Sequence, residues 1–208
     1  MSFPSLDKPS WPDTHAALCA YAGLAAAIKG SLCGDADLEC TTEGISTGPI
    51  AAGDQVFELC LALNAGHWRI RFADGAEWHR PLVGQSVVEL AEETFLLLET
   101  QAAQLEIEAE PEDADAEPLA FDRDAASAWF QAAIRVAAIF RQAGGVSWVN
   151  PDALTLSLHR DDEEIAVFHA VNGELHAEDA RLEYAELRHA EDPADVLAHW
   201  FDELMSSE

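Results

Sequence analysis

The sequence predicts an α+β fold in which antiparallel β-meanders are packed by helices. Apolar side chains recur at every second position in two neighbouring segments, the period of a strand with one buried face: Phe57, Leu59, Leu61 and Leu63, then Trp68, Ile70 and Phe72. The links Asn64-Ala65-Gly66 and Asp74-Gly75 tolerate the positive φ angles of tight hairpins. We therefore predict a three-stranded meander over residues Gln55–Leu82 and take it as the folding centre.

A helix is predicted ahead of the meander, over residues 12–29. Ser10 and Asp13 have the spacing of a capping box, and Gly30 is a stop signal. The apolar residues of this segment fall three or four positions apart, which is the stripe of a helix lying on a sheet: Leu18, Tyr21, Ala22, Ala25 and Ile28.

The connection between this helix and the meander contains a short predicted strand, Asp37–Thr41, and then a segment, 43–50, with two glycines and one proline. Glycine and proline interrupt regular structure, so we expect an irregular turn here. Two interpretations of segment 43–50 stay open. It is a connector into the meander, or its hydroxyls and amides hold an anion or a ligand oxygen.

A second helix is predicted over residues 86–102, because Ser86-Val87-Val88-Glu89 has the pattern of a capping box. A strand, Leu105–Ala109, follows it. Residues 110–118 are acidic, contain two prolines and carry no large apolar side chain, which is typical of a solvated linker.

The order of elements then repeats. A helix capped by Asp122 or Asp124 is predicted to run to about Gln142, where Gly144-Gly145 ends it. The elements expected after it are the strands Leu154–Leu158 and Ile165–Val171, a hairpin closed by Asn172-Gly173, and a last helix from Asp192-Pro193.

Two pseudo-repeated helix–meander–helix halves are therefore predicted, residues 1–109 and 119–208, joined by the linker 110–118. The first-half strand that ends at Asn64 and the second-half strand that ends at Asn172 are offset by 108 positions, which suggests structurally related halves. We expect the two halves to form one compact domain.

The net charge of −28 comes from 39 acidic and 11 basic residues. It argues against nucleic acid as a partner, because a phosphate backbone is bound by cations. Residues 1–104 hold 14 acids and 5 bases, a charge of −9, whereas residues 105–208 hold 25 acids and 6 bases, a charge of −19.

Two interpretations of this charge stay open: a solvated surface that keeps the protein soluble, or a surface that steers a basic protein partner. A solvated acidic surface repels itself at low ionic strength, so we expect added salt to raise the melting temperature. We also expect the crowded carboxylates to have raised pKa values, so that a mild fall in pH stabilises the fold.

The four cysteines form no C-x-x-C pair, and Cys19 and Cys60 lie in apolar elements, which favours buried thiols in a reducing cytoplasm. The first residues lack the basic and apolar regions of an export signal, and no window reaches the ~18 apolar residues of a membrane span. We expect a cytoplasmic protein without a membrane partner.

The histidines do not have the spacing of a metal site. Five of them fall in or beside predicted strands, with no H-E-x-x-H or short Cys/His pattern: His67, His79, His159, His169 and His176. No G-x-S-x-G, P-loop or G-x-G-x-x-G motif occurs either. We expect no catalytic residue, no metal and no cofactor.

Arg69 and Arg71 alternate with the apolar residues of their strand, so both project from the face opposite the core. Glu58 and Glu77 on the flanking strands are the expected cross-strand partners. This face is either a solvated surface with paired charges or a polar binding surface bounded by Trp78 or His79.

Several motifs, in the order in which they occur here, resemble a bacterial domain-of-unknown-function family whose members are usually longer than this chain. The order covers nearly the whole sequence. The motifs are Trp11-x-Asp13-Thr14, Gly44-Ile45-Ser46-Thr47-Gly48-Pro49-Ile50, Phe57-Glu58-Leu59, Trp68-Arg69-Ile70-Arg71, Gln85-Ser86-Val87, Phe121-Asp122, Trp129-Phe130, Tyr184-Ala185-Glu186-Leu187-Arg188 and Asp192-Pro193-Ala194.

The chain departs from this family at Val146–Leu158. The family has a His- and aromatic-rich stretch there, whereas this chain has Ser147-Trp148-Val149-Asn150-Pro151-Asp152. If that stretch is the working site of the family, the site is eroded in this chain. The resemblance implies a fold and no reaction.

Hairpins and acidic charge without catalytic signatures favour a non-enzymatic binding or interaction module. The alternative is a small-molecule-binding protein or enzyme with a pocket between the two halves. For that pocket the candidate ligand-binding residues are Thr47, Arg71 and Trp148.

Overall fold

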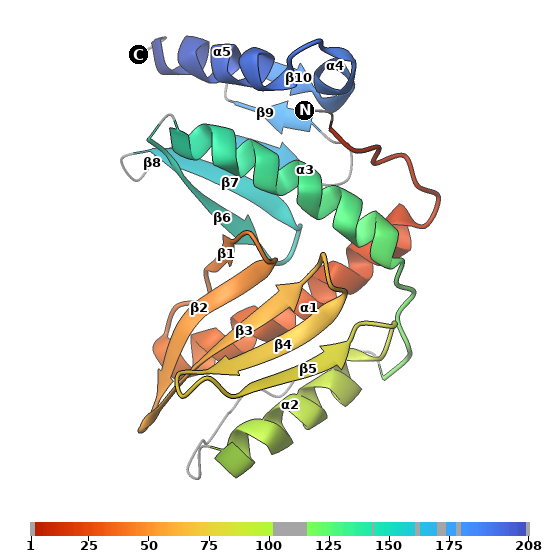
Figure 1. Cartoon of the computed structure of the whole chain (residues 1–208), viewed down its shortest axis with the longest axis vertical. Helices are drawn as coiled ribbons and strands as arrows, with labels where there is room; N and C mark the ends of the chain where they lie inside the picture. Colours follow the sequence, from red (N-terminus) through yellow and green to blue (C-terminus); the bar gives the residue numbers. More distant parts are fainter. Residues whose placement is uncertain are drawn as a thin grey trace.

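The computed structural model describes residues 3–101, 116–142, 144–160, 163–169, 174–177 and 180–206. Within these ranges the chain forms five helices and ten strands, and the ten strands build one antiparallel sheet (Figure 1). The predicted α+β class with antiparallel strands is confirmed.

The elements fall into two sets, and each set consists of a helix, then five strands, then one or two helices. The first set is α1 (Trp11–Cys33), β1 (Leu38–Cys40), β2 (Ile45–Ala52), β3 (Gln55–Ala62), β4 (His67–Phe72), β5 (Glu77–Pro81) and α2 (Val87–Gln101). The second set is α3 (Arg123–Gln142), β6 (Val146–Asn150), β7 (Thr155–Arg160), β8 (Glu163–His169), β9 (Glu174–His176), β10 (Arg181–Glu183), α4 (Tyr184–His189) and α5 (Pro193–Ser206).

The strand order is β10-β9-β8-β7-β6-β1-β2-β3-β4-β5. Each set of five strands runs outward from the centre of the sheet, and the two sets meet where β1 pairs with β6. Two positions join them, Leu38 opposite Val149 and Glu39 opposite Trp148. We call this β1–β6 pair the seam, and it brings together residues from distant parts of the sequence.

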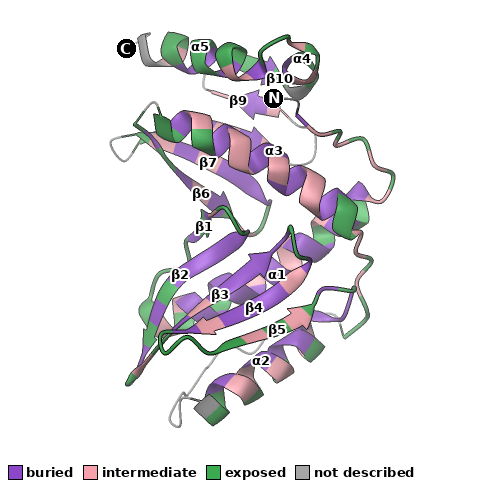
Figure 2. Ribbon diagram, viewed as in Figure 1, coloured by how far each residue is buried: buried purple, intermediate pink, exposed green. Residues whose placement is uncertain are grey.

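The predicted meander is confirmed as β3, β4 and β5, with Leu59 opposite Ile70 and Glu58 opposite Arg71. Its alternate apolar residues are buried on the sheet face that α1 and α3 cover, with α1 against β2 and β3 and α3 against β6 and β7. Figure 2 shows buried residues concentrated in the strands and along these two helices. The core thus lies between one face of the sheet and α1 with α3.

Side-chain caps start two helices as predicted. The Ser86 hydroxyl accepts a hydrogen bond from the Glu89 amide at 3.1 Å, and Asp192 accepts one from the Ala194 amide at 3.1 Å. Each cap satisfies an amide of the first turn that has no partner within the helix.

Asp122 caps α3 and also holds it against α1. One carboxylate oxygen of Asp122 accepts from the Asp124 amide at 2.8 Å, and the other accepts from the Ser10 hydroxyl at 2.6 Å. The Thr14 hydroxyl accepts from the Asp122 amide at 3.0 Å. The predicted capping box at Ser10 is therefore wrong, because this hydroxyl is used between the two halves and not on the first turn of α1.

Two further boundaries differ from the prediction. The helix α1 continues through Gly30 and ends at Cys33, with Gly34 in the left-handed conformation at φ 73° as its C-cap. Segment 43–50 is not an irregular turn, because β2 begins at Ile45. A bulge between Ser46 and Pro49, with Gly48 at φ 65°, accommodates the glycine and the proline inside the strand.

The sequence did not predict β6, β10 or α4, and it indicated β9 only as the second strand of the hairpin at Asn172-Gly173. The predicted strand 105–109, most of the linker 110–118 and the Asn172-Gly173 turn lie outside the described residues. The strands around that turn, β8 and β9, are paired as the predicted hairpin requires, with Phe168 opposite Leu175.

Within the described ranges one helix, α1, is long and apolar enough by length and composition to cross a bilayer, with a mean hydropathy of 1.5 over its most apolar window. Half of that window is buried inside the protein. The core helix of a globular domain has the same properties, so this observation assigns no location.

Candidate functional site

The candidate site is the face of the sheet turned away from α1 and α3, which we call the open face. Directly paired residues of neighbouring strands lie on the same face of a sheet. The register therefore defines a continuous row on the open face with one residue from each strand, from β5 to β10: His79, Arg69, Cys60, Ser46, Glu39, Trp148, Ser157, Val167, His176 and Arg181.

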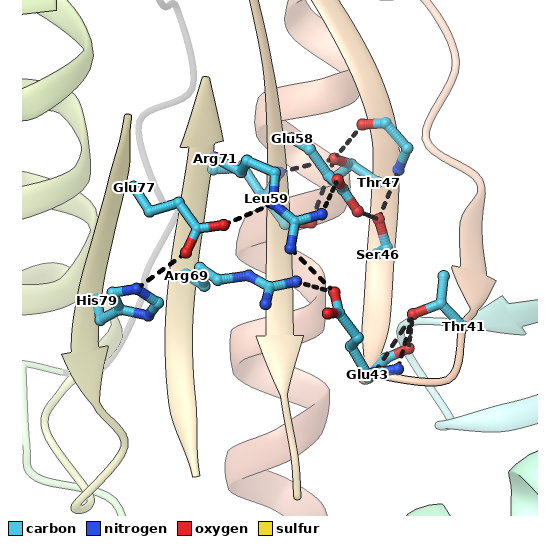
Figure 3. A network of polar contacts seen from close by, with 12 residues as sticks. Thr41, Glu43, Ser46, Thr47, Glu58, Leu59, Arg69, Arg71, Glu77 and His79 are labelled. Atoms are coloured by element: carbon cyan, nitrogen blue, oxygen red, sulfur yellow. Dashed lines mark hydrogen bonds and ion pairs between the residues drawn. The ribbon is translucent and has the colours of Figure 1, made fainter. Parts of the chain in front are cut away.

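An arginine–glutamate cluster occupies the first half of this face. Arg71 pairs with Glu77 at 2.7 Å and with Glu58 at 3.7 Å, and both Arg69 and Arg71 contact the Glu43 carboxylate. Figure 3 shows these side chains in front of the strands, while α1 passes behind them. The predicted projection of both arginines from the non-core face, with Glu58 and Glu77 as partners of Arg71, is confirmed.

Sequence reasoning missed Glu43. It belongs to the connection between β1 and β2, where Thr41 holds the turn by donating to the Gly44 carbonyl at 3.0 Å. Gly44 is required here, because a Cβ at this position would lie 1.8 Å from the Leu61 carbonyl oxygen. This close approach brings Glu43 over β4, a placement that no local sequence pattern signals.

The ion pairs of the cluster shift the pKa values of four of its members in the direction that favours the charged form. A hydrogen bond from Arg69 lowers the pKa of Glu43, and one from Arg71 lowers the pKa of Glu77. Hydrogen bonds to Glu43 and Glu77, respectively, raise the pKa values of Arg69 and Arg71. These four side chains are thus held in their charged forms at neutral pH.

These shifts correct one expectation. Wherever the pKa of a carboxylate in the described residues is clearly displaced it is lowered, at Asp35, Glu43, Glu77 and Asp122. Crowding was expected to raise such values. Local hydrogen bonds from the few bases, amides and hydroxyls outweigh the net charge at these four positions.

Of the predicted ligand-binding residues, Thr47 is engaged inside the sheet. Its hydroxyl accepts from the Leu59 amide at 3.0 Å and donates to the Gly48 carbonyl at 2.8 Å, and the residue is 1% exposed. It thereby completes the strand pairing at the bulge. Ser46, beside it, donates to Glu58 at 2.5 Å and so connects the bulge to the charged cluster.

Trp148 lies at the seam and lines two hollows. The larger, about 470 Å³, is lined by residues of both halves, including Glu39 and Thr42 before β2 and Arg141 and Ser147 around the start of β6. The smaller, about 360 Å³, is lined by Trp148 as well, together with Asp37 and His159. Neither hollow contains Thr47 or Arg71, so the three predicted residues occupy three different environments.

The expected borders of the binding face are half right. His79 lies on the open face, 3.3 Å from Glu77. Trp78 stands opposite Ile70 and packs against the core, so it belongs to the helix-covered face.

Three of the cysteines have pKa values raised by burial, Cys19 to about 11 and both Cys40 and Cys60 to about 12. These thiols are protonated at neutral pH, and the thiol is a poor nucleophile. Within the described ranges no three His, Cys, Asp or Glu side chains are grouped closely enough to hold a metal ion. Two histidine pairs face each other on the sheet, His67 with His79 and His169 with His176.

The model of a family of unknown function, DUF5996, matches residues 3–149. The chain belongs to this family. The match extends from the residues before α1 into β6 and ends at Val149, inside the segment Val146–Leu158 where we expected a departure from the family. No curated protein and no solved structure matches the chain.

Proposed function

We propose that this member of the DUF5996 family is a non-enzymatic binding module that engages a basic protein partner through the open face of its sheet. The observation that carries the proposal is the open face itself, a row of side chains across all ten strands that α1 and α3 do not cover. Arg69, Cys60 and Ser46 are buried within this row, whereas its other members are exposed or partly exposed and are accessible to a macromolecule.

Charge favours a basic partner. Carboxylates outnumber arginines on and beside the open face: Glu39, Glu43, Glu58, Glu77, Glu174 and Glu183 against Arg69, Arg71 and Arg181. The net charge of the whole chain is −28, and it accelerates the encounter with a basic protein. The same charge opposes nucleic acid and an anionic membrane surface. We retain a cytoplasmic location as part of this proposal.

The chemistry of the face also favours binding over catalysis. A general base works best with a pKa near the working pH, whereas the pKa values of Glu43 and Glu77 are lowered. The buried thiol on this face, Cys60, is protonated. These side chains are suited to recognition of charge.

The test is capture from the native lysate with two charge-reversed variants. Glu39 is exposed at the centre of the open face, and Glu92 is exposed on α2. We expect Glu39→Lys to lose the captured partner and Glu92→Lys to keep it, with release by salt. A partner that all three proteins retain equally, or that Glu92→Lys alone loses, would overturn the proposal.

A specific observation supports a second candidate function, a small-molecule-binding protein or enzyme with a pocket between the two halves. The larger hollow at the seam has about 470 Å³, within the range of small-ligand sites, and both halves line it. Trp148 is the predicted residue that this pocket uses. Binding of a small molecule at the seam, seen by NMR shifts of residues 39–42 and 145–148, tests this candidate.

We also propose that the two halves arose by duplication and unfold as one compact domain. Support comes from the element order and from positions 108 apart that begin corresponding strands, Leu38 with Val146 and Gln55 with Glu163. The single sheet that both halves share favours one cooperative transition. Two separate unfolding transitions would contradict the one-domain version.

A further inference from the structure

The larger hollow exists because the pairing of β1 with β6 is so short. Beyond the pair Glu39–Trp148 the two strands separate, and the gap is lined from one side by the end of β1 and from the other by the start of β6. The polar or aromatic side chains that line it are Glu39, Thr41, Thr42, Arg141, Ser147 and Trp148.

Arg141 is the cation of this hollow. It lies in the last turn of α3, and its guanidinium donates to the Cys40 carbonyl at 2.6 Å. Among the described residues no carboxylate forms an ion pair with it, although acids outnumber bases by 39 to 11 in the chain. Its remaining donors have the planar geometry that holds a carboxylate.

Two more groups of the hollow lack partners within the described part of the chain. The Ser147 hydroxyl is buried, in a residue only 7% exposed, and makes no hydrogen bond. A buried hydroxyl without a partner is costly, and a ligand atom can supply the bond. The exposed Glu39 carboxylate has no hydrogen-bond or ion-pair partner either.

A simple anion does not suit this place, because Glu39 and the net charge of −28 repel it. A simple cation leaves Arg141 without a counter-ion. A molecule that carries both charges on neighbouring atoms satisfies Arg141 and Glu39 together and adds no net charge. The indole of Trp148 and the half-exposed Val146 add apolar surface for a side chain.

We propose that the hollow at the seam binds a small zwitterion of the α-amino-acid type with an apolar side chain. Arg141 holds its carboxylate, Glu39 its ammonium group, Ser147 a polar atom of the ligand, and Trp148 packs against its side chain. The inference rests on the second candidate function, a small-molecule pocket between the halves, and names its ligand class.

The experiment uses three matched probes on the full chain: L-phenylalanine, 3-phenylpropionate, which lacks the ammonium group, and phenethylamine, which lacks the carboxylate. Binding is followed by NMR shifts of residues 39–42 and 145–148 and by calorimetry. We expect L-phenylalanine to bind, and each truncated probe to bind about tenfold more weakly or worse.

Two arginine variants provide the internal control. Arg141→Gln should weaken L-phenylalanine binding about tenfold, and Arg141→Lys should restore part of it. Arg123→Gln should leave binding unchanged. Arg123 resembles Arg141 in donating to a backbone carbonyl, that of Asn64 at 3.1 Å, but it does not line the hollow.

Two results would overturn the proposal, and only the second would also exclude a small-molecule pocket at the seam. Tight binding of 3-phenylpropionate or phenethylamine at the same residues, equal to that of L-phenylalanine, leaves the pocket but excludes a zwitterion as its ligand class. If none of the three probes shifts residues 39–42 and 145–148 up to about 10 mM, the small-molecule pocket fails as well. The open-face proposal is independent of both results.

Discussion

The two halves of the sheet carry the same order of strands but complete their open faces differently. In the first half, Arg69 and Arg71 are surrounded by three glutamates, and Arg69 is only 9% exposed. In the second half, Arg181 is exposed, with Glu174 and Glu183 as its ion-pair partners. The first half buries one arginine of its charged cluster, and the second half leaves its arginine exposed.

At the seam between the halves the charges are arranged differently again. Arg141 and Glu39 both line the larger hollow, yet no ion pair joins them in the described structure. This difference between paired and unpaired charges indicates where a ligand could bind. Charges already paired within the fold contribute to structure, whereas charges without partners beside a hollow remain available to a ligand.

The largest expected effect compares one glycine from each half. A Cβ on Gly44 would lie 1.8 Å from the Leu61 carbonyl oxygen, which is backbone, whereas a Cβ on Gly145 would lie 2.0 Å from the Phe140 ring. Because a ring can shift and a paired strand cannot, Gly44→Ala should cost about 3 kcal/mol or more of unfolding free energy and Gly145→Ala about 1–2 kcal/mol. Urea unfolding measures both.

Gly23→Ala is the matched control, since no atom lies within 4 Å of its added Cβ and the position is helical. It should be neutral or slightly stabilising. If Gly145→Ala lowers the unfolding free energy more than Gly44→Ala, the Phe140 ring yields less readily than the backbone at Leu61, and the expected order is wrong.

The next effect compares two arginines of the open face, one from each half of the sheet. Arg69→Gln removes a largely buried guanidinium and its ion pair with Glu43 and should cost about 1–3 kcal/mol, because the shorter amide leaves the buried site incompletely filled and cannot replace the charged hydrogen bond. Arg181→Gln removes an exposed arginine from its partners Glu174 and Glu183 and should cost about 0–1 kcal/mol, because water screens the arginine side of each pair. Equal losses of unfolding free energy in urea would show that the burial of Arg69 does not make it more important for stability than Arg181.

Much of the open face in the first half could be predicted from the sequence, because strand alternation fixes which side chains share a face. Arg69 and Arg71 were placed correctly for this reason, as were Glu58 and Glu77 on the neighbouring strands. Glu43 was not, since it reaches the cluster from a connection whose path depends on a glycine contact with β3.

The seam could not be predicted. Of its two strands, β6 was obscured by the polar and proline residues around it. At the far edge of the sheet β10 was missed as well, because a strand of three residues shows no period. Arg141 and Glu39 lie in different halves, and strand order alone brings them together. The sequence therefore indicated a pocket between the halves but supplied Thr47 and Arg71, whose positions in the sheet lie elsewhere.

A pH series separates the charged cluster from the rest of the acidic surface. The pKa values of Glu43 and Glu77 are lowered in the fold, so their contribution is present above the unfolded carboxylate pKa of about 4.3 and is lost as pH falls through the lowered values. The wild type should therefore lose more stability between about pH 5 and pH 3 than Arg71→Gln, which lacks part of these pairs.

Urea unfolding at each pH measures this difference, which should be smaller than the effect of Arg69→Gln because Arg71 is half-exposed. Arg80→Gln, which breaks the pairs with Glu89 and Glu93 on α2, is the control for loss of a cation elsewhere. Parallel pH curves for the wild type and Arg71→Gln would show that the cluster does not cause the acid sensitivity.

The smallest expected effect concerns salt and the uneven charge. Like charges repel over about 30 Å at 10 mM salt but over only a few Å at about 500 mM, so the melting temperature should rise by a few degrees across that range. Exposed ion pairs such as Lys8 with Asp124 weaken at the same time, yet each contributes only about 0–1 kcal/mol. With 39 acids against 11 bases, repulsion should win.

Charge reversal at one exposed glutamate in each half sharpens this comparison. Glu92 lies within residues 1–104, which carry −9, and Glu191 lies within residues 105–208, which carry −19, and both glutamates are exposed. At about 10 mM salt, where screening is weakest, Glu191→Lys should raise the melting temperature more than Glu92→Lys, because it removes repulsion from the more acidic stretch of the chain. At about 500 mM the two should converge. A wild-type melting temperature that falls with added salt would instead mean that specific pairs such as those of Arg69 and Arg71 outweigh the net charge. The acidic surface would then act through individual contacts, and the case for long-range steering of a basic partner would weaken with it.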